Sequence, residues 1–256
     1  MVTPALNFVE TPFHPNDEGN ILLQFRERGF VRVENVFERD SVDPFLAQIQ
    51  AIVRKTDKPY APYDLPNDNP LTIWPAKAPR MRHILRSAFA WGRQRPQLCL
   101  FHPSWLVKPH NPDERLVHDW HKDGDHESFG TLNGHYQYPS VIHVNIYFAD
   151  MTLEHGPTYV IPRSHRDGTL SPYNGAKEEP LMANKGDIVM WDQRMWHRAS
   201  PRTIPGLRIV AIWGFCSFPL GVEKPFKLTP AQKRAYQETK DPAEKILFGG
   251  PFDMES

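Results

Sequence analysis

Hydrophobic and polar positions divide the chain into a helical beginning, a long region of short strands and a helical end. Apolar residues recur at helical spacing over residues 17–29, and Gly29 is suited to end this helix. Residues 30–36 alternate between apolar and polar, which predicts a half-buried strand. Two further helices are expected, one that Asp40 can cap and one over residues 80–95.

Between residues 97 and 218 the pattern changes to short apolar runs that glycine and proline interrupt. The clearest runs predict strands at Leu98–Leu106, Val141–Phe148, Thr158–Ile161, Ile188–Trp191 and Arg208–Phe215. Many short strands at intervals are typical of a β-sandwich or a jelly-roll barrel. Farther along, Thr229 and Pro230 are suited to the N-cap and the first position of a charged helix over residues 231–239.

These patterns predict one domain over residues 1–256 that is mainly β with flanking helices. It comprises an N-terminal helical flank at 17–95, a β-core at about 97–218 and a C-terminal helical tail at 219–256. Residues 57–79 are rich in proline, asparagine and aspartate and are expected to form a long loop.

Composition narrows the classes of function. The formal net charge is zero, so the chain has no general attraction to nucleic acid or to anionic membranes. Two cysteines do not suggest a disulfide framework, and no run approaches the roughly 20 apolar residues of a spanning helix. The N-terminus does not look like a signal peptide. We therefore expect a cytoplasmic protein that acts on a small molecule, with no nucleic-acid or membrane partner.

Three residues are candidate metal ligands. On an extended strand, His121 and Asp123 point to the same side because they are two positions apart. His197 follows an apolar strand that begins at the turn Gly186-Asp187, so it is a plausible third ligand. Two imidazoles and one carboxylate leave positions open on a metal, which suits a non-haem Fe(II) site.

Basic residues give two further hypotheses. An arginine facing into a barrel needs a carboxylate partner, so Arg208 could bind either a dicarboxylate co-substrate or an internal acidic side chain. Residues 69–112 contain no acid. Their lysines and arginines, which could form a solvated helix face or could recruit an anionic substrate, are Lys77, Arg80, Arg82, Arg86, Arg93, Arg95 and Lys108.

Four motifs occur in a specific order. They are W-H-K-D at Trp120–Asp123, E-H-G-P at Glu154–Pro157, I-P-R-S-H-R at Ile161–Arg166 and G-D-I at Gly186–Ile188. Together with His197 and Arg208, they resemble the phytanoyl-CoA dioxygenase family. Members of that family are Fe(II)- and 2-oxoglutarate-dependent oxygenases on a double-stranded β-helix, which is a jelly-roll, cupin-like fold. The resemblance covers about residues 17–218.

The resemblance implies a set of site residues. His121, Asp123 and His197 would be the catalytic metal ligands, with Fe(II), 2-oxoglutarate and O2 as cofactors. The residues that it places around 2-oxoglutarate are Arg208, Thr158, His118 and Asn145. His118 stands where family members often have glutamine.

The expected reaction is hydroxylation of a small metabolite, which could be anionic, with succinate and CO2 as co-products. Related halogenases have a small residue where this chain has Asp123, so the carboxylate favours hydroxylation or another hydrogen abstraction. Two alternatives remain. A zinc hydrolase would use the histidine and aspartate cluster over residues 118–126, although its spacing is wrong and H-E-x-x-H is absent. A non-catalytic metal-binding protein on the same fold is the other.

Overall fold

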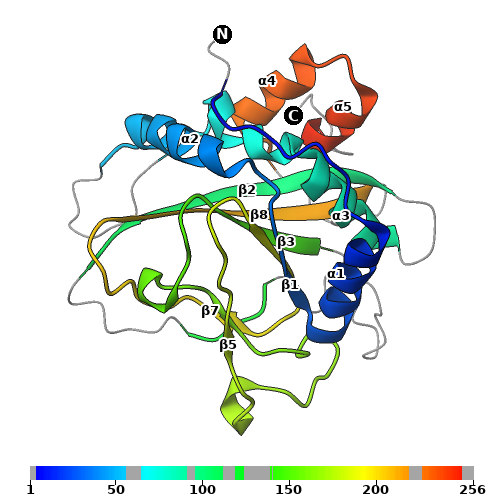
Figure 1. The fold of residues 1–256 in the computed structure, drawn as a ribbon, viewed down its shortest axis with the longest axis vertical. Helices are drawn as coiled ribbons and strands as arrows, with labels where there is room; N and C mark the ends of the chain where they lie inside the picture. The colour runs from blue at the N-terminus through cyan, green and yellow to red at the C-terminus, as the bar shows by residue number, and fades with distance from the viewer. Residues whose placement is uncertain are drawn as a thin grey trace.

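Two antiparallel sheets and a layer of helices make up the computed structural model (Figure 1). The structure describes residues 4–55, 65–90, 96–111, 119–123, 139, 141–218 and 227–249. The fold is a double-stranded β-helix with flanking helices, as the sequence predicted.

The larger sheet has five strands in the order β1-β6-β3-β8-β2. Their bounds are β1 Phe30–Val33, β2 Gln97–Pro109, β3 Val141–Tyr147, β6 Ile188–Asp192 and β8 Leu207–Phe218. Neighbouring strands are far apart in the sequence, so the sheet joins the N-terminal strand to the C-terminal half of the chain. β2 and β8 are the longest pair and run antiparallel with a register shift between Leu100 and His102.

The smaller sheet has three short strands in the order β5-β4-β7. They are β4 Tyr159–Val160, β5 Glu179–Pro180 and β7 His197–Arg198. An isolated antiparallel bridge between His121 and His197 continues the pairing beyond β7.

The helices are α1 Pro15–Arg28, α2 Arg39–Ile52, α3 Pro79–Ala90, α4 Pro230–Glu238 and α5 Pro242–Gly249. Four short 3-10 helices are η1 Pro70–Thr72, η2 Trp74–Lys77, η3 Leu153–His155 and η4 Pro172–Asn174. In Figure 1, α2, α4 and α5 lie on one side of β2, β8 and β3, whereas β5 and β7 lie on the other.

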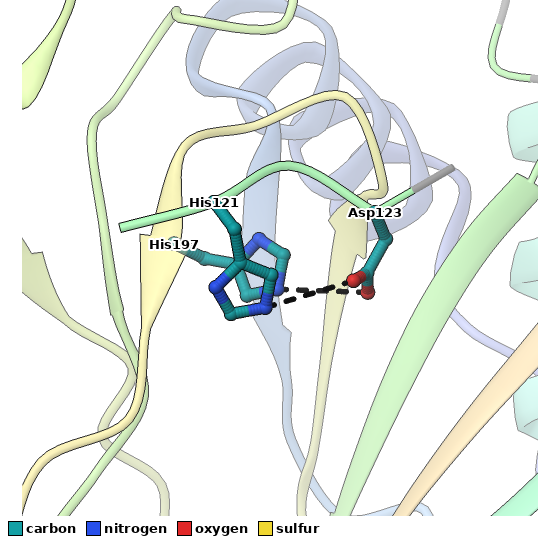
Figure 2. A group of neighbouring side chains, drawn as sticks. All are labelled: His121, Asp123 and His197. Carbon is teal, nitrogen blue, oxygen red and sulfur yellow. Dashed lines mark ion pairs between the residues drawn. The ribbon is translucent and has the colours of Figure 1, made fainter. Parts of the chain in front are cut away.

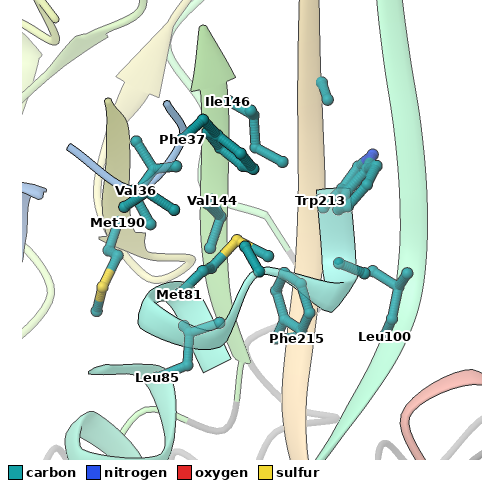
Figure 3. Close-up of a cluster of buried hydrophobic side chains, with 14 of the residues drawn as sticks. Val36, Phe37, Met81, Leu85, Leu100, Val144, Ile146, Met190, Trp213 and Phe215 are labelled. Atoms are coloured by element: carbon teal, nitrogen blue, oxygen red, sulfur yellow. The ribbon is translucent and has the colours of Figure 1, made fainter. Parts of the chain in front are cut away.

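The larger sheet buries both of its faces because alternate residues of a strand point in opposite directions. On the outer face, Val144, Trp213 and Phe215 pack with Met81 and Leu85 of α3 (Figure 3). On the inner face, a second apolar cluster joins the two sheets, and it includes Tyr147, Val160, Leu181, Val189, Trp191 and Val210. Polar side chains that interrupt this inner cluster form the candidate site.

Most predicted elements are confirmed, with differences at their ends. Gly29 ends α1 in the left-handed conformation, with φ of 86°, and the Thr229 side chain accepts a hydrogen bond from the Gln232 N–H at the start of α4. α2 begins at Arg39 rather than after Asp40, and its N-cap has no side-chain hydrogen bond. The sequence did not predict β5 or β7, and in the predicted helical tail at 219–256 it placed a helix only at 231–239, whereas the structure also contains α5.

Part of the predicted long loop, residues 57–64, lies outside the described residues; the rest contains η1 and η2. No helix in the described part of the chain has both the length and the apolar character to cross a membrane.

Candidate metal centre

Backbone pairing brings the three predicted ligands together. The His121 N–H donates to the His197 carbonyl at 3.0 Å, and the His197 N–H donates to the His121 carbonyl at 2.9 Å. Residues directly opposite in an antiparallel pair have neighbouring side chains on the same face. The Asp123 N–H donates to the Gln193 carbonyl at 3.2 Å, which holds the end of this segment against the turn before β7.

The three side chains point toward one another (Figure 2). One potential ligand atom from each of His121, Asp123 and His197 lies within 4.8 Å of the other two. His121 Nε2 is 3.7 Å from Asp123 Oδ1, and His197 Nε2 is 3.5 Å from Asp123 Oδ2. The His121 side chain is half-exposed whereas His197 is buried, so the group opens on the His121 side.

Hydrogen bonds from the far side of each ring fix which nitrogen faces the group. His121 Nδ1 lies 2.9 Å from the Asp119 carbonyl, and His197 Nδ1 lies 3.1 Å from the Met195 carbonyl. A carbonyl oxygen can only accept, so each Nδ1 carries a proton, and Nε2 is the nitrogen that faces Asp123. Metal-binding histidines in proteins are held in the same way. The donor set therefore fits a divalent metal.

Asp123 supplies negative charge. Burial alone would raise the pKa of its carboxyl, but the hydrogen bond from His197 and the charges of His197, His143 and His121 outweigh it. The resulting pKa of Asp123 is about 2. The carboxylate is therefore ionised at neutral pH and available as an anionic ligand.

His143 is a residue of the site that the sequence analysis missed. It lies on β3, is buried, and its Nε2 is 3.2 Å from Asp123 Oδ2. The available signal was the alternation on β3, where His143, Asn145 and Tyr147 share one face between Ile142, Val144 and Ile146.

Arg208 lies at the other end of the same face. It is buried at the start of β8, and its Nη1 donates to the Ser200 carbonyl at 3.4 Å. Lys108 on β2 is its direct cross-strand partner, so both cations lie on the inner face of the sheet. The pKa of the Tyr147 hydroxyl is raised, because the effect of burial exceeds the lowering by the hydrogen bond from Asn145 and by the charge of Arg208.

The other predicted contacts of the co-substrate have different outcomes. Thr158 is buried. It lies near the Arg208 end of the site, since the carbonyl of the preceding Pro157 accepts a hydrogen bond from Ser200 Oγ at 2.6 Å, and the Ser200 carbonyl accepts from Arg208. The Asn145 side chain bonds to two neighbours, accepting from the Trp191 indole and donating to the Tyr147 hydroxyl, both at 3.0 Å. Asn145 thus holds these aromatic side chains in place. His118 lies outside the described residues.

The acid-free stretch mostly stabilises the helical layer. Lys77 forms an ion pair with α5, Arg80 donates to two backbone carbonyls, and Arg86 donates to the Pro96 carbonyl. The hypothesis that these cations recruit an anionic substrate stays a prediction. Lys108 differs, since it lies beside Arg208. Arg93 and Arg95 are outside the described residues.

Several solved structures share this fold. One is the epimerase SnoN in complex with Fe3+, alpha ketoglutarate and nogalamycin RO, with a TM-score of 0.59 and 16% identity, covering 82% of this chain and 89% of that one. HygX from Streptomyces hygroscopicus with nickel and 2-oxoglutarate bound has a TM-score of 0.60 and 17% identity, covering 81% and 90%. The non-haem monooxygenase ThoJ in a nickel complex has a TM-score of 0.61 and 16% identity, covering 82% of each chain.

A family comparison identifies the chain itself. The family described as phytanoyl-CoA dioxygenase (PhyH) matches residues 25–210, which is well over half of the chain. The match spans the elements that carry the His121, Asp123 and His197 group and the start of β8 with Arg208. The chain therefore belongs to the phytanoyl-CoA dioxygenase family.

Proposed function

We propose that this protein is an Fe(II)- and 2-oxoglutarate-dependent oxygenase that hydroxylates a small molecule. The observation that carries the proposal is the convergence of two imidazole Nε2 atoms and one carboxylate within 4.8 Å. Two histidines and a carboxylate on one side of a metal leave room for a co-substrate and O2, as in non-haem Fe(II) oxygenases.

His121, Asp123 and His197 would hold the metal through the atoms that already face one another. Their orientation is set before binding, because backbone carbonyls hold the two imidazoles from behind. With Fe(II) and 2-oxoglutarate bound, the centre would supply oxidising chemistry from O2, with succinate and CO2 as co-products.

Arg208 would bind the far carboxylate of 2-oxoglutarate. A guanidinium matches a carboxylate with two parallel hydrogen bonds, and the buried position of Arg208 strengthens that attraction. Lys108, directly opposite, adds a second positive charge beside Arg208. Tyr147 and Thr158 supply hydroxyl groups in this region, and Val210 with the other inner-face apolar residues limits the access of water.

The relatives of known structure support this choice of metal and co-substrate. The SnoN structure contains Fe3+ and alpha ketoglutarate, and the HygX structure contains nickel and 2-oxoglutarate. The activities of these proteins differ, since SnoN is an epimerase and ThoJ is a monooxygenase. We propose hydroxylation for this chain because Asp123 provides a carboxylate ligand and because the chain belongs to the phytanoyl-CoA dioxygenase family.

The test is 2-oxoglutarate turnover. The protein, loaded with Fe(II) in air, is screened against a metabolite library for substrate-stimulated formation of succinate, and products are analysed by mass spectrometry for an added oxygen atom. Asp123→Ala should abolish the stimulated turnover. Asp119→Ala is the matched control, because it keeps the backbone carbonyl that holds His121.

Different results would favour the alternatives. Hydrolysis that depends on Zn(II) and is independent of 2-oxoglutarate would indicate a zinc hydrolase. Metal binding without turnover of 2-oxoglutarate under any condition would indicate a non-catalytic protein.

A further inference from the structure

His143 is closer to the Asp123 carboxylate than either proposed ligand histidine. Its Nε2 lies 3.2 Å from Asp123 Oδ2, compared with 3.5 Å for His197 and 3.7 Å for the nearest approach of His121. It does not belong to the group whose ligand atoms all converge within 4.8 Å. His143 therefore contacts the carboxylate from outside the group.

An aromatic contact holds the His143 ring in place. The Trp191 indole stacks on it with a centroid distance of 4.5 Å and an interplanar angle of 20°. The same indole packs against the His197 ring, also at 4.5 Å but tilted by 52°. One buried tryptophan thus contacts a proposed ligand and the histidine behind the carboxylate.

Buried hydrogen bonds in turn hold the tryptophan. Its Nε1–H donates to Asn145 Oδ1 at 3.0 Å, and Asn145 Nδ2 donates to the Tyr147 hydroxyl at 3.0 Å. The Tyr147 hydroxyl donates to the Leu181 carbonyl at 3.3 Å, which anchors the chain of bonds in the backbone. These bonds fix the indole surface on which the His143 ring stacks, because breaking them would leave buried polar groups unpaired, which is costly.

We propose that His143 is a positioning residue that holds the Asp123 side chain toward the two ligand imidazoles without binding the metal itself. This inference rests on the proposed metal centre. A carboxylate with a free side-chain torsion loses conformational entropy when it binds a metal, and a neighbour that restrains it beforehand reduces that loss. Outer partners of metal ligands typically contribute about 10-fold to 100-fold in metal affinity.

The experiment measures the affinity of the apoprotein for Co(II), from absorption in the visible region and from quenching of tryptophan fluorescence. His143→Phe keeps a ring against Trp191 but removes the polar contact with Asp123. Its dissociation constant for Co(II) should rise by about 10-fold to 100-fold. His143→Gln retains a side-chain N–H and should lose clearly less affinity.

A matched control and a double-mutant cycle separate positioning from general packing. His83 also contacts a carboxylate, with Nε2 at 3.0 Å from Glu18 Oε2, but it lies on α3 in the helical layer. His83→Phe should leave the Co(II) affinity unchanged. In an Asp123→Asn background, His143→Phe should have little further effect, because its action passes through the carboxylate.

The outcomes are distinguishable. Wild-type affinity in folded His143→Phe would overturn the positioning role, as would an undiminished effect of His143→Phe in the Asp123→Asn background. If His143→Phe does not fold, His143→Leu and His143→Gln are compared by the same measurements, and equal affinities would overturn it. If Asp123→Ala binds Co(II) as tightly as the wild type, the proposed metal centre itself is wrong.

Discussion

Asp123 and Arg208 place opposite charges near the two ends of the inner face of the larger sheet. Asp123 is anionic because its pKa is about 2, and it lies beside His121 and His197. Arg208 is cationic and buried at the start of β8. A molecule that can both coordinate a metal through one end and present a carboxylate at the other would match this distribution of charge.

Arg208→Met tests the cationic end. The change removes the guanidinium but keeps much of the apolar volume, so the dissociation constant for 2-oxoglutarate should rise by at least about 10-fold, equivalent to about 1.4 kcal/mol. The affinity for the metal alone should stay unchanged. Isothermal titration under anaerobic conditions measures both quantities.

Arg166→Met is the control for loss of a positive charge. Arg166 forms an exposed ion pair with Glu27 at 2.7 Å and has no part in the site. Equal 2-oxoglutarate affinity in Arg208→Met and Arg166→Met would contradict the assignment of Arg208.

Residue spacing and ordered motifs were enough to predict the metal group. His121 and Asp123 are two positions apart, and the resemblance supplied His197 and Arg208 from distant segments. His143 could not be selected in this way, because its role depends on the packing of β3 against β6 and on a contact with a segment from elsewhere in the chain. No local pattern encodes that contact.

At the level of elements, a turn after η3 supports the Arg208 end. Gly156 follows η3 with φ of 75°, a conformation that suits glycine. A Cβ at this position would lie 2.8 Å from the Ser200 carbonyl oxygen and 2.9 Å from the Pro201 backbone. Ser200 is also the residue whose carbonyl accepts from Arg208. The close approach explains why the E-H-G-P motif needs its glycine.

Gly156→Ala should therefore displace the Ser200 backbone and disturb the hydrogen bond that the Ser200 carbonyl accepts from Arg208. We expect a lower melting temperature and a weaker affinity for 2-oxoglutarate, with a smaller change in metal affinity. Thermal unfolding and ligand titration measure these effects.

Gly175→Ala is the matched control for backbone strain. Gly175 also has a positive φ, of 81°, but an added Cβ there meets no atom within 4 Å. If both variants lose stability but bind 2-oxoglutarate equally well, the proposed coupling of Gly156 to Arg208 is wrong.

Long strands were easier to predict than short ones, although the two-residue β4 was predicted from the apolar run at Thr158–Ile161. The apolar runs behind β2, β3, β6 and β8 are long enough to show their character. β7 has two residues, too few to show alternation, yet it carries His197. Its existence depends on pairing with β4 and with His121, which are tertiary contacts.

In the molecule as a whole, the larger sheet separates a stabilising layer from a chemical one. Its outer face packs against the helices and contains most of the buried apolar side chains, whereas its inner face carries His143, Asn145 and Arg208 and contacts Asp123 through His143. The sequence predicted the jelly-roll class and the flanking helices. It could not give the strand order β1-β6-β3-β8-β2, because alternation shows which residues share a face but not which strands are neighbours.

Phe215→Ala tests this separation. Phe215 is fully buried on the outer face of β8 (Figure 3). Its truncation should lower the free energy of unfolding by about 3–5 kcal/mol, because it loses buried apolar area and leaves a cavity. The folded fraction should bind metal with unchanged affinity. Denaturant unfolding and metal titration measure the two properties.

Leu23→Ala is the control, since Leu23 is 59% exposed on α1 and its truncation should change stability little. A large loss of metal affinity in folded Phe215→Ala would show that the two faces are not independent.

The proposed function requires that His121, Asp123 and His197 hold Fe(II) with a position open for 2-oxoglutarate. Its most direct test is an anaerobic titration of the apoprotein with Fe(II) and then 2-oxoglutarate, followed by visible absorption. We predict a weak charge-transfer band that requires both ligands, persists in Asp119→Ala and disappears in Asp123→Ala and His197→Ala. No band in the wild type, or an unchanged band in both ligand variants, would show that these three residues do not form the proposed Fe(II) site.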